Sequence, residues 1–136
     1  MGGDLVHLLI GAGLVSLGAI AGTPLRFFVS RFAGARVGET FPWGTLVVNA
    51  SGCLIMGLVA AYAVHFGYAG TSDYWLLLAT GFLGSYTTVS SFALQTLALV
   101  RGGERFAALG YIGLSVGLCL GAVALGYWAG FAAVTR

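Results

Sequence analysis

The sequence predicts an all-α membrane protein whose chain crosses the bilayer four times. Of its 136 residues, 59% are hydrophobic and only 7% are charged, and the mean hydropathy is +0.97. Soluble domains carry about 25% charged residues, so this chain has too few charges to cover a soluble surface. It also contains four apolar runs, each longer than the roughly 18 residues that indicate a spanning helix. The alternating segments of about 10 residues that build a transmembrane barrel are not seen.

The four runs follow one another closely, so we expect a single transmembrane domain comprising residues 1–136. The short connectors make consecutive helices neighbours and leave no room for a soluble domain. The first run is too long for a signal-peptide core and follows Asp4 rather than a basic segment, so we expect it to stay as a helix. The expected helices are Leu5–Val29, Gly44–Phe66, Tyr74–Val100 and Phe106–Phe131, joined by Ser30–Trp43, Gly67–Asp73 and Arg101–Arg105.

Most basic residues lie on one side of this four-span layout. All six are arginine, and no basic cluster indicates nucleic acid as a partner. Under the positive-inside rule, the excess of arginine beside the first and third connectors predicts that both termini are outside. The arginines on that side are Arg31, Arg36, Arg101 and Arg105, and Arg136 lies on the other.

Glycine is the main packing device that the sequence offers. Small residues four apart let helix backbones approach closely in lipid, where packing drives association. Four helices bury little on their own, so a glycine face without an internal partner favours an oligomer. The spacing occurs at Gly18 and Gly22 in the first helix, and at Gly113, Gly117 and Gly121, followed by Gly126 and Gly130, in the fourth.

Polar side chains recur at helical spacing in the second helix. Thr45, Asn49, Cys53 and Met56 share one face. An amide in an apolar segment is costly without partners. Asn49 therefore either forms an interhelical hydrogen bond or presents its NH₂ group to an anion. In the first helix, Arg26 either snorkels to the headgroups or pairs with a polar pocket inside the protein.

The third apolar run carries its polar residues at its centre. The segment Gly81–Phe92 contains two glycines, three serines and two threonines. Glycine and β-branched threonine both weaken a helix. Non-helical backbone at that depth requires protein cover or a wet cavity, so we predict a helix broken at mid-membrane with a site at the break. After the break, Thr88, Ser91, Phe92 and Gln95 form a face. Phe92 either packs or turns its positive ring edge to an anion.

The fourth helix carries hydroxyls opposite its glycines. Tyr111, Ser115 and Cys119 recur every four residues, about 200° around the helix from the glycine stripe. A lone serine often bonds to its own helix, and a tyrosine often anchors at the interface. Together on one line, they favour a polar track. We expect Cys53 and Cys119 to be small buried residues, because their spacing matches no metal or redox motif.

No carboxylate is embedded in the four runs. The acids Asp4, Glu39, Asp73 and Glu104 fall at segment ends or in connectors, and His7 and His65 lie near helix ends. A proton-coupled transporter normally needs a buried titratable group. Neither a catalytic triad nor a zinc ligand set is present, so we expect no enzyme. A neutral lining of hydroxyls, an amide and ring edges suits passive movement of a small anion.

Three segments in order resemble the CrcB/Fluc family of fluoride channels. They are Gly18–Phe27, with GAIAGTPLRF; Phe41–Gly52, with FPWGTLVVNASG; and Gly81–Phe92, with GFLGSYTTVSSF. The resemblance implies a passive fluoride exporter in the inner (plasma) membrane, in contact with lipid. It implies an antiparallel dimer of four-helix subunits, usually a homodimer of dual topology and in some members a heterodimer with a paralogue.

The resemblance also implies roles for individual residues. A structural Na⁺ at the dimer centre would be bound by the backbone carbonyls of Gly84 and Thr87. The fluoride pore would be lined by Asn49, Ser91, Phe92, Tyr111, Ser115 and Arg26.

The chain departs from the family pattern at three positions. Ser85 stands where the family has glycine, Val89 where it has a second phenylalanine, and Gln95 where it has glutamate. These departures would affect either the fluoride pathway on one side of the protein or the selectivity and rate of fluoride conduction. Two alternatives remain for the function. They are a small four-helix multidrug antiporter, disfavoured by the lack of an embedded carboxylate, and a non-transporting scaffold subunit, disfavoured by the polar faces.

Overall fold

The computed structural model describes residues 2–38, 41–70 and 72–136. Within them every regular element is a helix and no strand is present, and four helical spans are long and apolar enough to cross a membrane. This confirms the prediction of an all-α membrane protein. The elements are α1 (Gly2–Val37), α2 (Trp43–His65), α3 (Asp73–Trp75), η1 (Leu76–Leu83), α4 (Gly84–Tyr86), α5 (Val89–Arg101) and α6 (Arg105–Val134).

The first helix is longer than the sequence predicted. The expected connector Ser30–Trp43 is helical as far as Val37, so Arg31 and Arg36 lie on α1 and not in a loop. Polar residues end the apolar run but do not end the helix. In this polar part of α1 the guanidinium of Arg36 lies over the Phe32 ring, 4.6 Å from its centroid. The helix ends at Gly38, whose φ of +123° suits glycine. Glu39, placed in the same connector, lies outside the described residues.

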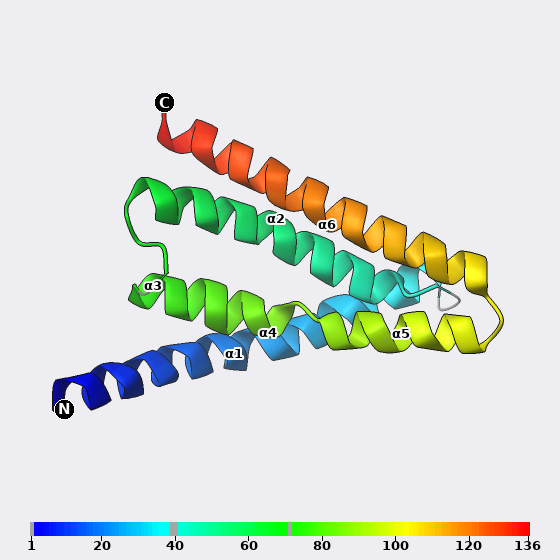
Figure 1. Cartoon of the computed structure of the whole chain (residues 1–136), viewed down its shortest axis with the longest axis horizontal. Coiled ribbons are helices and arrows are strands. Elements are labelled where there is room, and N and C mark those ends of the chain that lie inside the picture. The colour runs from blue at the N-terminus through cyan, green and yellow to red at the C-terminus, as the bar shows by residue number, and fades with distance from the viewer. Residues whose placement is uncertain (1, 39–40, 71) are drawn as a thin grey trace.

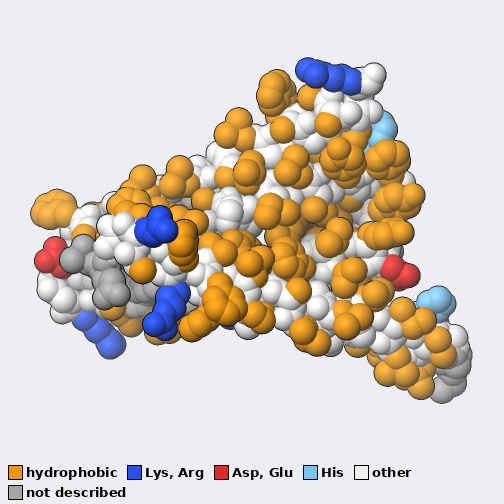
Figure 2. Space-filling model, turned by 180° about the vertical axis from the view of Figure 1, so that it is seen from behind, with side chains coloured by type: hydrophobic (Ala, Val, Ile, Leu, Met, Phe, Trp, Pro, Cys, Tyr) orange, Lys and Arg blue, Asp and Glu red, His pale blue; other side chains and the backbone are white. Residues whose placement is uncertain are grey.

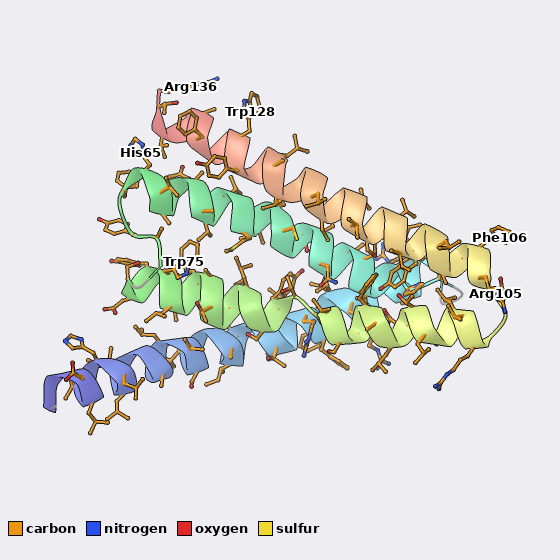
Figure 3. All side chains as sticks on the ribbon, in the orientation of Figure 1. His65, Trp75, Arg105, Phe106, Trp128 and Arg136 are labelled. Atoms are coloured by element: carbon orange, nitrogen blue, oxygen red, sulfur yellow. The ribbon has the colours of Figure 1, made fainter. Side chains whose placement is uncertain are left out.

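The remaining boundaries agree closely with the predicted ones, and α6 runs about one turn further than expected. Both termini lie at one end of the bundle, as a four-span layout requires (Figure 1). His65 and Arg136 lie at that end, and Arg105 lies at the other (Figure 3). Apolar side chains cover much of the surface between the ends, and basic side chains gather at the Arg105 end (Figure 2). Such a surface suits lipid.

Close backbone contacts at glycine join α1 to η1 and α6 to α2. A Cβ built on Gly18 would lie 2.3 Å from the Leu77 carbonyl oxygen, and one on Gly22 would lie 2.3 Å from that of Phe82. These contacts join α1 to η1. A Cβ built on Gly126 would lie 2.1 Å from the Leu54 carbonyl oxygen, which joins α6 to α2. Glycine spacing therefore marks close helix packing, as predicted for the first helix.

The glycine stripe in the first half of α6 has no close partner among the described residues. A Cβ built on Gly113, Gly117 or Gly121 meets no atom within 4 Å. The glycines at the two ends of α6 therefore have different surroundings. Gly126 and Gly130 pack against α2, whereas Gly113, Gly117 and Gly121 lie on the open face of the helix.

Candidate functional site

The third span changes its helical geometry twice along its length. It begins as α3, continues as the π-helix η1 and ends its first half with the single turn α4. Thr87 and Thr88 then have extended backbone, with φ/ψ of −81°/162° and −153°/117°. The helix resumes at Val89 as α5. Two helix ends therefore meet here, and each leaves backbone groups that need other partners.

Asn49 supplies those partners from α2. Its Oδ1 accepts a hydrogen bond from the Thr88 N–H at 2.8 Å, and its Nδ2 donates to the Thr88 carbonyl oxygen at 2.9 Å. The amide therefore clasps the extended pair from both sides. Of the two alternatives open for Asn49, the interhelical hydrogen bond is the one the structure contains. An amide carries two N–H donors, so one remains after this pairing.

Thr88 also begins α5. Its Oγ1 accepts a hydrogen bond from the Ser91 N–H at 3.2 Å, which is the ordinary bond of a helix N-cap. The same hydroxyl donates to Ser91 Oγ at 3.1 Å, and Ser90 Oγ lies 3.2 Å from it. The Ser91 hydroxyl accepts in this arrangement, so its own hydrogen is available to another acceptor.

Arg26 lines a polar cavity beside this helix start. The cavity has a volume of about 760 Å³. Arg26 and Arg31 contribute its positive charge, and the N-terminus of α5 adds the positive end of a helix dipole. Of the two alternatives for Arg26, this position favours the polar pocket over snorkelling. The lining residues are Thr23, Arg26, Phe27, Ser30, Arg31, Ala35, Thr45, Val48, Thr88 and Ser91, none of them acidic.

A second polar group surrounds Tyr111, which is fully buried. Its hydroxyl donates to Gln95 Oε1 at 2.9 Å. The ring lies between two phenylalanines, with centroids 5.2 Å from Phe92 at an interplanar angle of 45° and 5.5 Å from Phe41 at 86°. Tyr111 is therefore a core residue that ties α6 to α5 and not an anchor at the interface.

The Ser115 hydroxyl lies one turn beyond Tyr111 and has no hydrogen-bond partner among the described residues. The side chain is only 7% exposed. A serine that bonded back to its own helix would be satisfied, so the structure does not contain that arrangement. A buried polar atom without a partner is rare in folded proteins and calls for an explanation.

Gly84 and Thr87 lie on a separate, smaller cavity of about 210 Å³. In a continuous helix the Thr88 N–H would bond to the Gly84 carbonyl oxygen, four residues earlier. Here that N–H bonds to Asn49, which releases the Gly84 carbonyl from this bond. Carbonyl oxygens are suitable ligands for a hard cation. The other lining residues are Gly52, Cys53, Met56, Ala79 and Leu83.

The predicted pore residues thus fall into three groups rather than one. Arg26 and Ser91 share the large cavity, Phe92 and Tyr111 share the aromatic group with Ser115 one turn away, and Asn49 joins α2 to the extended pair. The sequence reasoning missed Arg31, because it was placed in a loop. It also missed the Ser51 Oγ to Tyr86 hydroxyl contact at 2.8 Å, which no spacing in the sequence indicates.

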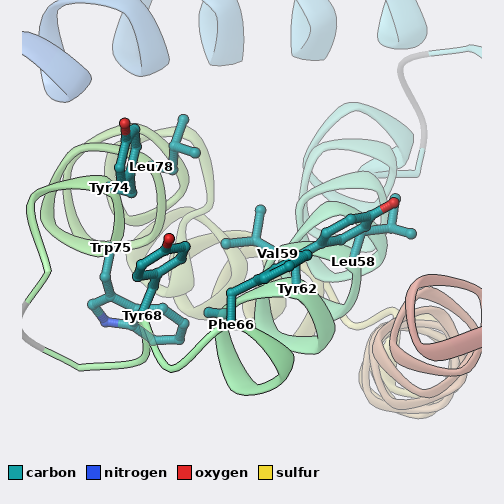
Figure 4. A pocket seen from close by; sticks show the side chains of 9 residues that line it. Leu58, Val59, Tyr62, Phe66, Tyr68, Tyr74, Trp75 and Leu78 are labelled. Carbon is teal, nitrogen blue, oxygen red and sulfur yellow. The ribbon is translucent and has the colours of Figure 1, made fainter. Parts of the chain in front are cut away.

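An apolar pocket of about 440 Å³ lies at the His65 end, away from these groups (Figure 4). Rings from α2, the following loop and α3 form its wall: Phe66 stacks at 6.4 Å on Tyr62 and at 6.2 Å on Tyr68. No charged side chain lines it. Aromatic residues concentrate where a membrane meets water, and the rings of this pocket have the composition expected of such a boundary.

These features define a small polytopic α-helical membrane protein with a polar interior that carries donors and positive charge. The chain belongs to the CrcB family: the family model described as CrcB-like protein, Camphor Resistance (CrcB), matches residues 13–127. This confirms the family predicted from the three motifs.

Relatives cover nearly the whole chain. It is 48% identical over 128 residues to "Fluoride-specific ion channel FluC 2" of Bradyrhizobium diazoefficiens, which covers 93% of both chains. It is 50% identical over 122 residues to "Fluoride-specific ion channel FluC 2" of Rhodopseudomonas palustris, covering 89% of this chain and 93% of that one. It is 46% identical over 115 residues to "Fluoride-specific ion channel FluC 4" of Brucella abortus, covering 84% and 86%. These relatives are named as ion channels, which confirms that the chain is not an enzyme.

Proposed function

We propose that the chain forms a passive fluoride-selective channel that exports F⁻ from the cytoplasm across the inner (plasma) membrane. The observation that carries this proposal is the buried Ser115 hydroxyl, which lacks a partner beside the aromatic group of Phe92 and Tyr111. A small anion entering an apolar interior must exchange its water for donors. An unpaired hydroxyl within that interior is such a donor. The names of the relatives support fluoride as the anion.

The cavity around Arg26 and Arg31 gives the anion a place to gather. Two guanidinium groups and the α5 N-terminus attract negative charge there. Ser91 lines this cavity and its hydroxyl hydrogen is free to donate. Asn49, which is bonded to the cavity-lining Thr88, keeps one further N–H donor. The hydroxyls of Tyr111 and Ser115 and the ring edge of Phe92 continue the lining. Within the described spans the acids stand only at helix ends, so the lining offers no proton carrier and supports passive flow.

The channel would be an antiparallel dimer of dual topology, and a homodimer is the favoured form. The open glycine stripe on α6 supports a partner, because a Cβ on Gly113 or Gly117 would meet no described residue within 4 Å. Val89 supports it as well, since it is 78% exposed where the family has a phenylalanine. The alternative is a heterodimer with a paralogue, which the numbers 2 and 4 in the relatives' names support.

A structural Na⁺ would lie at the centre of this dimer, at a mid-membrane break of the third span. The residues fit such an ion: Gly84 is exposed on the single chain, and its carbonyl is released from the helical bond to Thr88. Thr87 lines the same cavity. When bound, the cation would offset the partial negative charges of the carbonyl oxygens that meet there from both subunits. The two hydrogen bonds between Asn49 and the Thr88 backbone would keep those carbonyl oxygens free of helical hydrogen bonds.

The test is fluoride efflux from liposomes that contain the purified chain alone, followed with an electrode beside chloride efflux. We expect fluoride to leave down its gradient and chloride to stay. Absence of fluoride flux from the single chain would contradict the homodimer and direct attention to a paralogue partner. Flux that depends on a proton gradient would favour an antiporter. No flux with any partner would favour a scaffold subunit.

A further inference from the structure

The polar cavity that Arg26 lines is far larger than a fluoride ion requires. Its volume is about 760 Å³. A water molecule, which is close to fluoride in size, takes about 30 Å³ in the liquid. Pockets that bind small molecules have volumes of about 300–1,000 Å³. The cavity therefore has room for an anion made of several atoms.

The cavity extends from the interior of the bundle toward one of its ends. Helix α1 supplies Arg26, Ser30 and Arg31, and the first turns of α2 and α5 supply the other polar walls. A Cβ built on Gly44 would clash with the Ser30 carbonyl oxygen, so α1 at this point lies against the first turn of α2. Because α2 ends at His65, its first turn lies at the Arg105 end (Figure 3), where basic side chains gather (Figure 2).

The two arginines therefore stand at different depths. Arg31 follows Ser30 and is exposed, at the level where α2 begins. Spanning helices begin near the membrane surface, which is also where the phosphate groups of lipids lie. Arg26 is half-buried and lies five residues, or about 7.5 Å, further along the helix toward the interior. A ligand could thus enter beside Arg31 and reach Arg26.

The charge of the cavity is positive and has no counter-charge within it. None of the described residues that line it is acidic, so no carboxylate in the cavity offsets the two guanidinium groups. A charge held away from bulk water is costly unless an opposite charge accompanies it. A ligand that carries about two negative charges would balance the pair.

The chemistry of guanidinium selects among polyatomic anions. Its planar fork donates two parallel N–H bonds to the oxygens of a carboxylate or a phosphate. One carboxylate has two oxygens and a single negative charge, which one arginine satisfies. A phosphate monoester carries a charge of about −1.5 to −2 at pH 7 and three acceptor oxygens, so it can serve both arginines. The hydroxyls of Ser30 and Ser91 line the same space, and the hydrogen of the Ser91 hydroxyl is free to donate.

We propose that this cavity is a binding site for a phosphate monoester, with Arg26 and Arg31 as its charged ligands and Ser30 and Ser91 as hydroxyl donors. The phosphate belongs either to a membrane lipid or to a soluble phosphate ester, since both present the same group. A bound phosphate would occupy the place where fluoride gathers and would slow its entry. That consequence rests on the proposed function, whereas the binding itself does not.

The experiment measures binding to the purified full chain in detergent micelles with probes that separate the two sources. Phosphatidic acid carries the phosphate on a lipid, and diacylglycerol with the same acyl chains is its phosphate-free control. Native mass spectrometry measures the fraction of protein that retains each lipid. Glycerol 3-phosphate carries the same phosphate without acyl chains, and broadening of its phosphorus NMR line measures its binding. We expect the chain to retain phosphatidic acid or to bind glycerol 3-phosphate, and to show no comparable retention of diacylglycerol.

Three variants locate the binding within the molecule. Arg26→Gln and Arg31→Gln should each weaken it by about tenfold or more, since a hydrogen bond between charged groups contributes at least that factor. Arg36→Gln is the matched control, because it removes the same charge from the same helix but does not line the cavity. It should bind as the wild type does. Circular dichroism checks the fold of each variant, and Arg31→Gln, at an exposed position, keeps the test valid if Arg26→Gln does not fold.

The outcomes separate the alternatives. Retention of phosphatidic acid that the two cavity variants weaken supports the site and identifies a lipid as its source. Binding of glycerol 3-phosphate alone, with the same dependence on the variants, identifies a soluble ester. Equal retention of both lipids with no binding of glycerol 3-phosphate would overturn the proposal. Equal losses in Arg36→Gln and Arg31→Gln would also overturn it, because the charge of this end and not the cavity would then account for binding. Neither measurement involves fluoride flux, so failure of this site and failure of the channel are distinguishable.

Discussion

The clasp between Asn49 and Thr88 predicts a measurable loss of stability when the amide is removed. Asn49→Ala deletes both hydrogen bonds, of 2.8 and 2.9 Å. Interhelical hydrogen bonds in membrane proteins contribute about 0.6 kcal/mol on average, so two set a lower bound of about 1 kcal/mol. The Thr88 N–H is then left without a partner in a residue only 8% exposed. A buried unsatisfied donor costs about 1–3 kcal/mol. We expect the free energy of unfolding to fall by about 1–3 kcal/mol.

The assay is unfolding by a denaturing detergent in mixed micelles, followed by tryptophan fluorescence at one fixed protein concentration. The concentration is held constant because the stability of an oligomer depends on it. Ser51→Ala is the matched control on the same helix. It removes the side-chain contact to the Tyr86 hydroxyl but leaves both hydrogen bonds between Asn49 and the Thr88 backbone in place. We expect the control to lower stability by about 0.6 kcal/mol.

The reasoning is refuted if Asn49→Ala unfolds within about 0.5 kcal/mol of the wild type, a margin below the contribution of one interhelical hydrogen bond. It is equally refuted if the two variants lose the same stability, because an orphaned backbone N–H would then cost no more than a lost side-chain contact.

Three further predictions follow from single positions. Phe92→Ile should abolish fluoride flux in liposomes while the dimer stays folded, and unchanged flux would mean that the ring only packs against its neighbours. Ser115→Ala should lower fluoride flux about tenfold, since a lost hydrogen bond of about 1.4 kcal/mol corresponds to that factor; flux equal to the wild type would exclude this hydroxyl from the lining. Gly126→Ala should lower stability by about 1–3 kcal/mol, because its Cβ would lie 2.1 Å from the Leu54 carbonyl. Gly110→Ala, with no atom within 4 Å, should not, and equal effects would contradict the packing.

The spans could be predicted because lipid imposes length and hydropathy on each helix. The end of α1 could not be predicted, because polar residues replace apolar ones where the helix leaves the hydrocarbon core while the backbone remains helical. Arg31 illustrates the consequence: its charge correctly indicated the end of the apolar run, but it still lies on the helix and lines the cavity with Arg26. Only Gly38, with its positive φ, ends the helix.

For a related reason, the sequence could not predict which groups on neighbouring helices form hydrogen bonds with each other. Helical spacing fixes which residues share a face, but not which group of another helix lies opposite. Asn49 was rightly placed on the face of Thr45, yet its two bonds go to the backbone of Thr88, and a backbone group leaves no mark in a sequence pattern. Gln95 likewise stood out as a departure from a family pattern, and the structure makes it the acceptor for Tyr111.

The glycines show why equal spacing can serve different purposes. Gly126 and Gly117 belong to the same helix, yet Gly126 meets the backbone of α2, whereas a Cβ on Gly117 would meet nothing within 4 Å in the described part of the chain. An exposed glycine in the middle of a helix costs about 1 kcal/mol relative to alanine, and three such positions on one open face cost more together. A contact from outside the single chain would offset this cost. The close backbone approach that Gly126 already permits within the chain is the kind of contact that would do so.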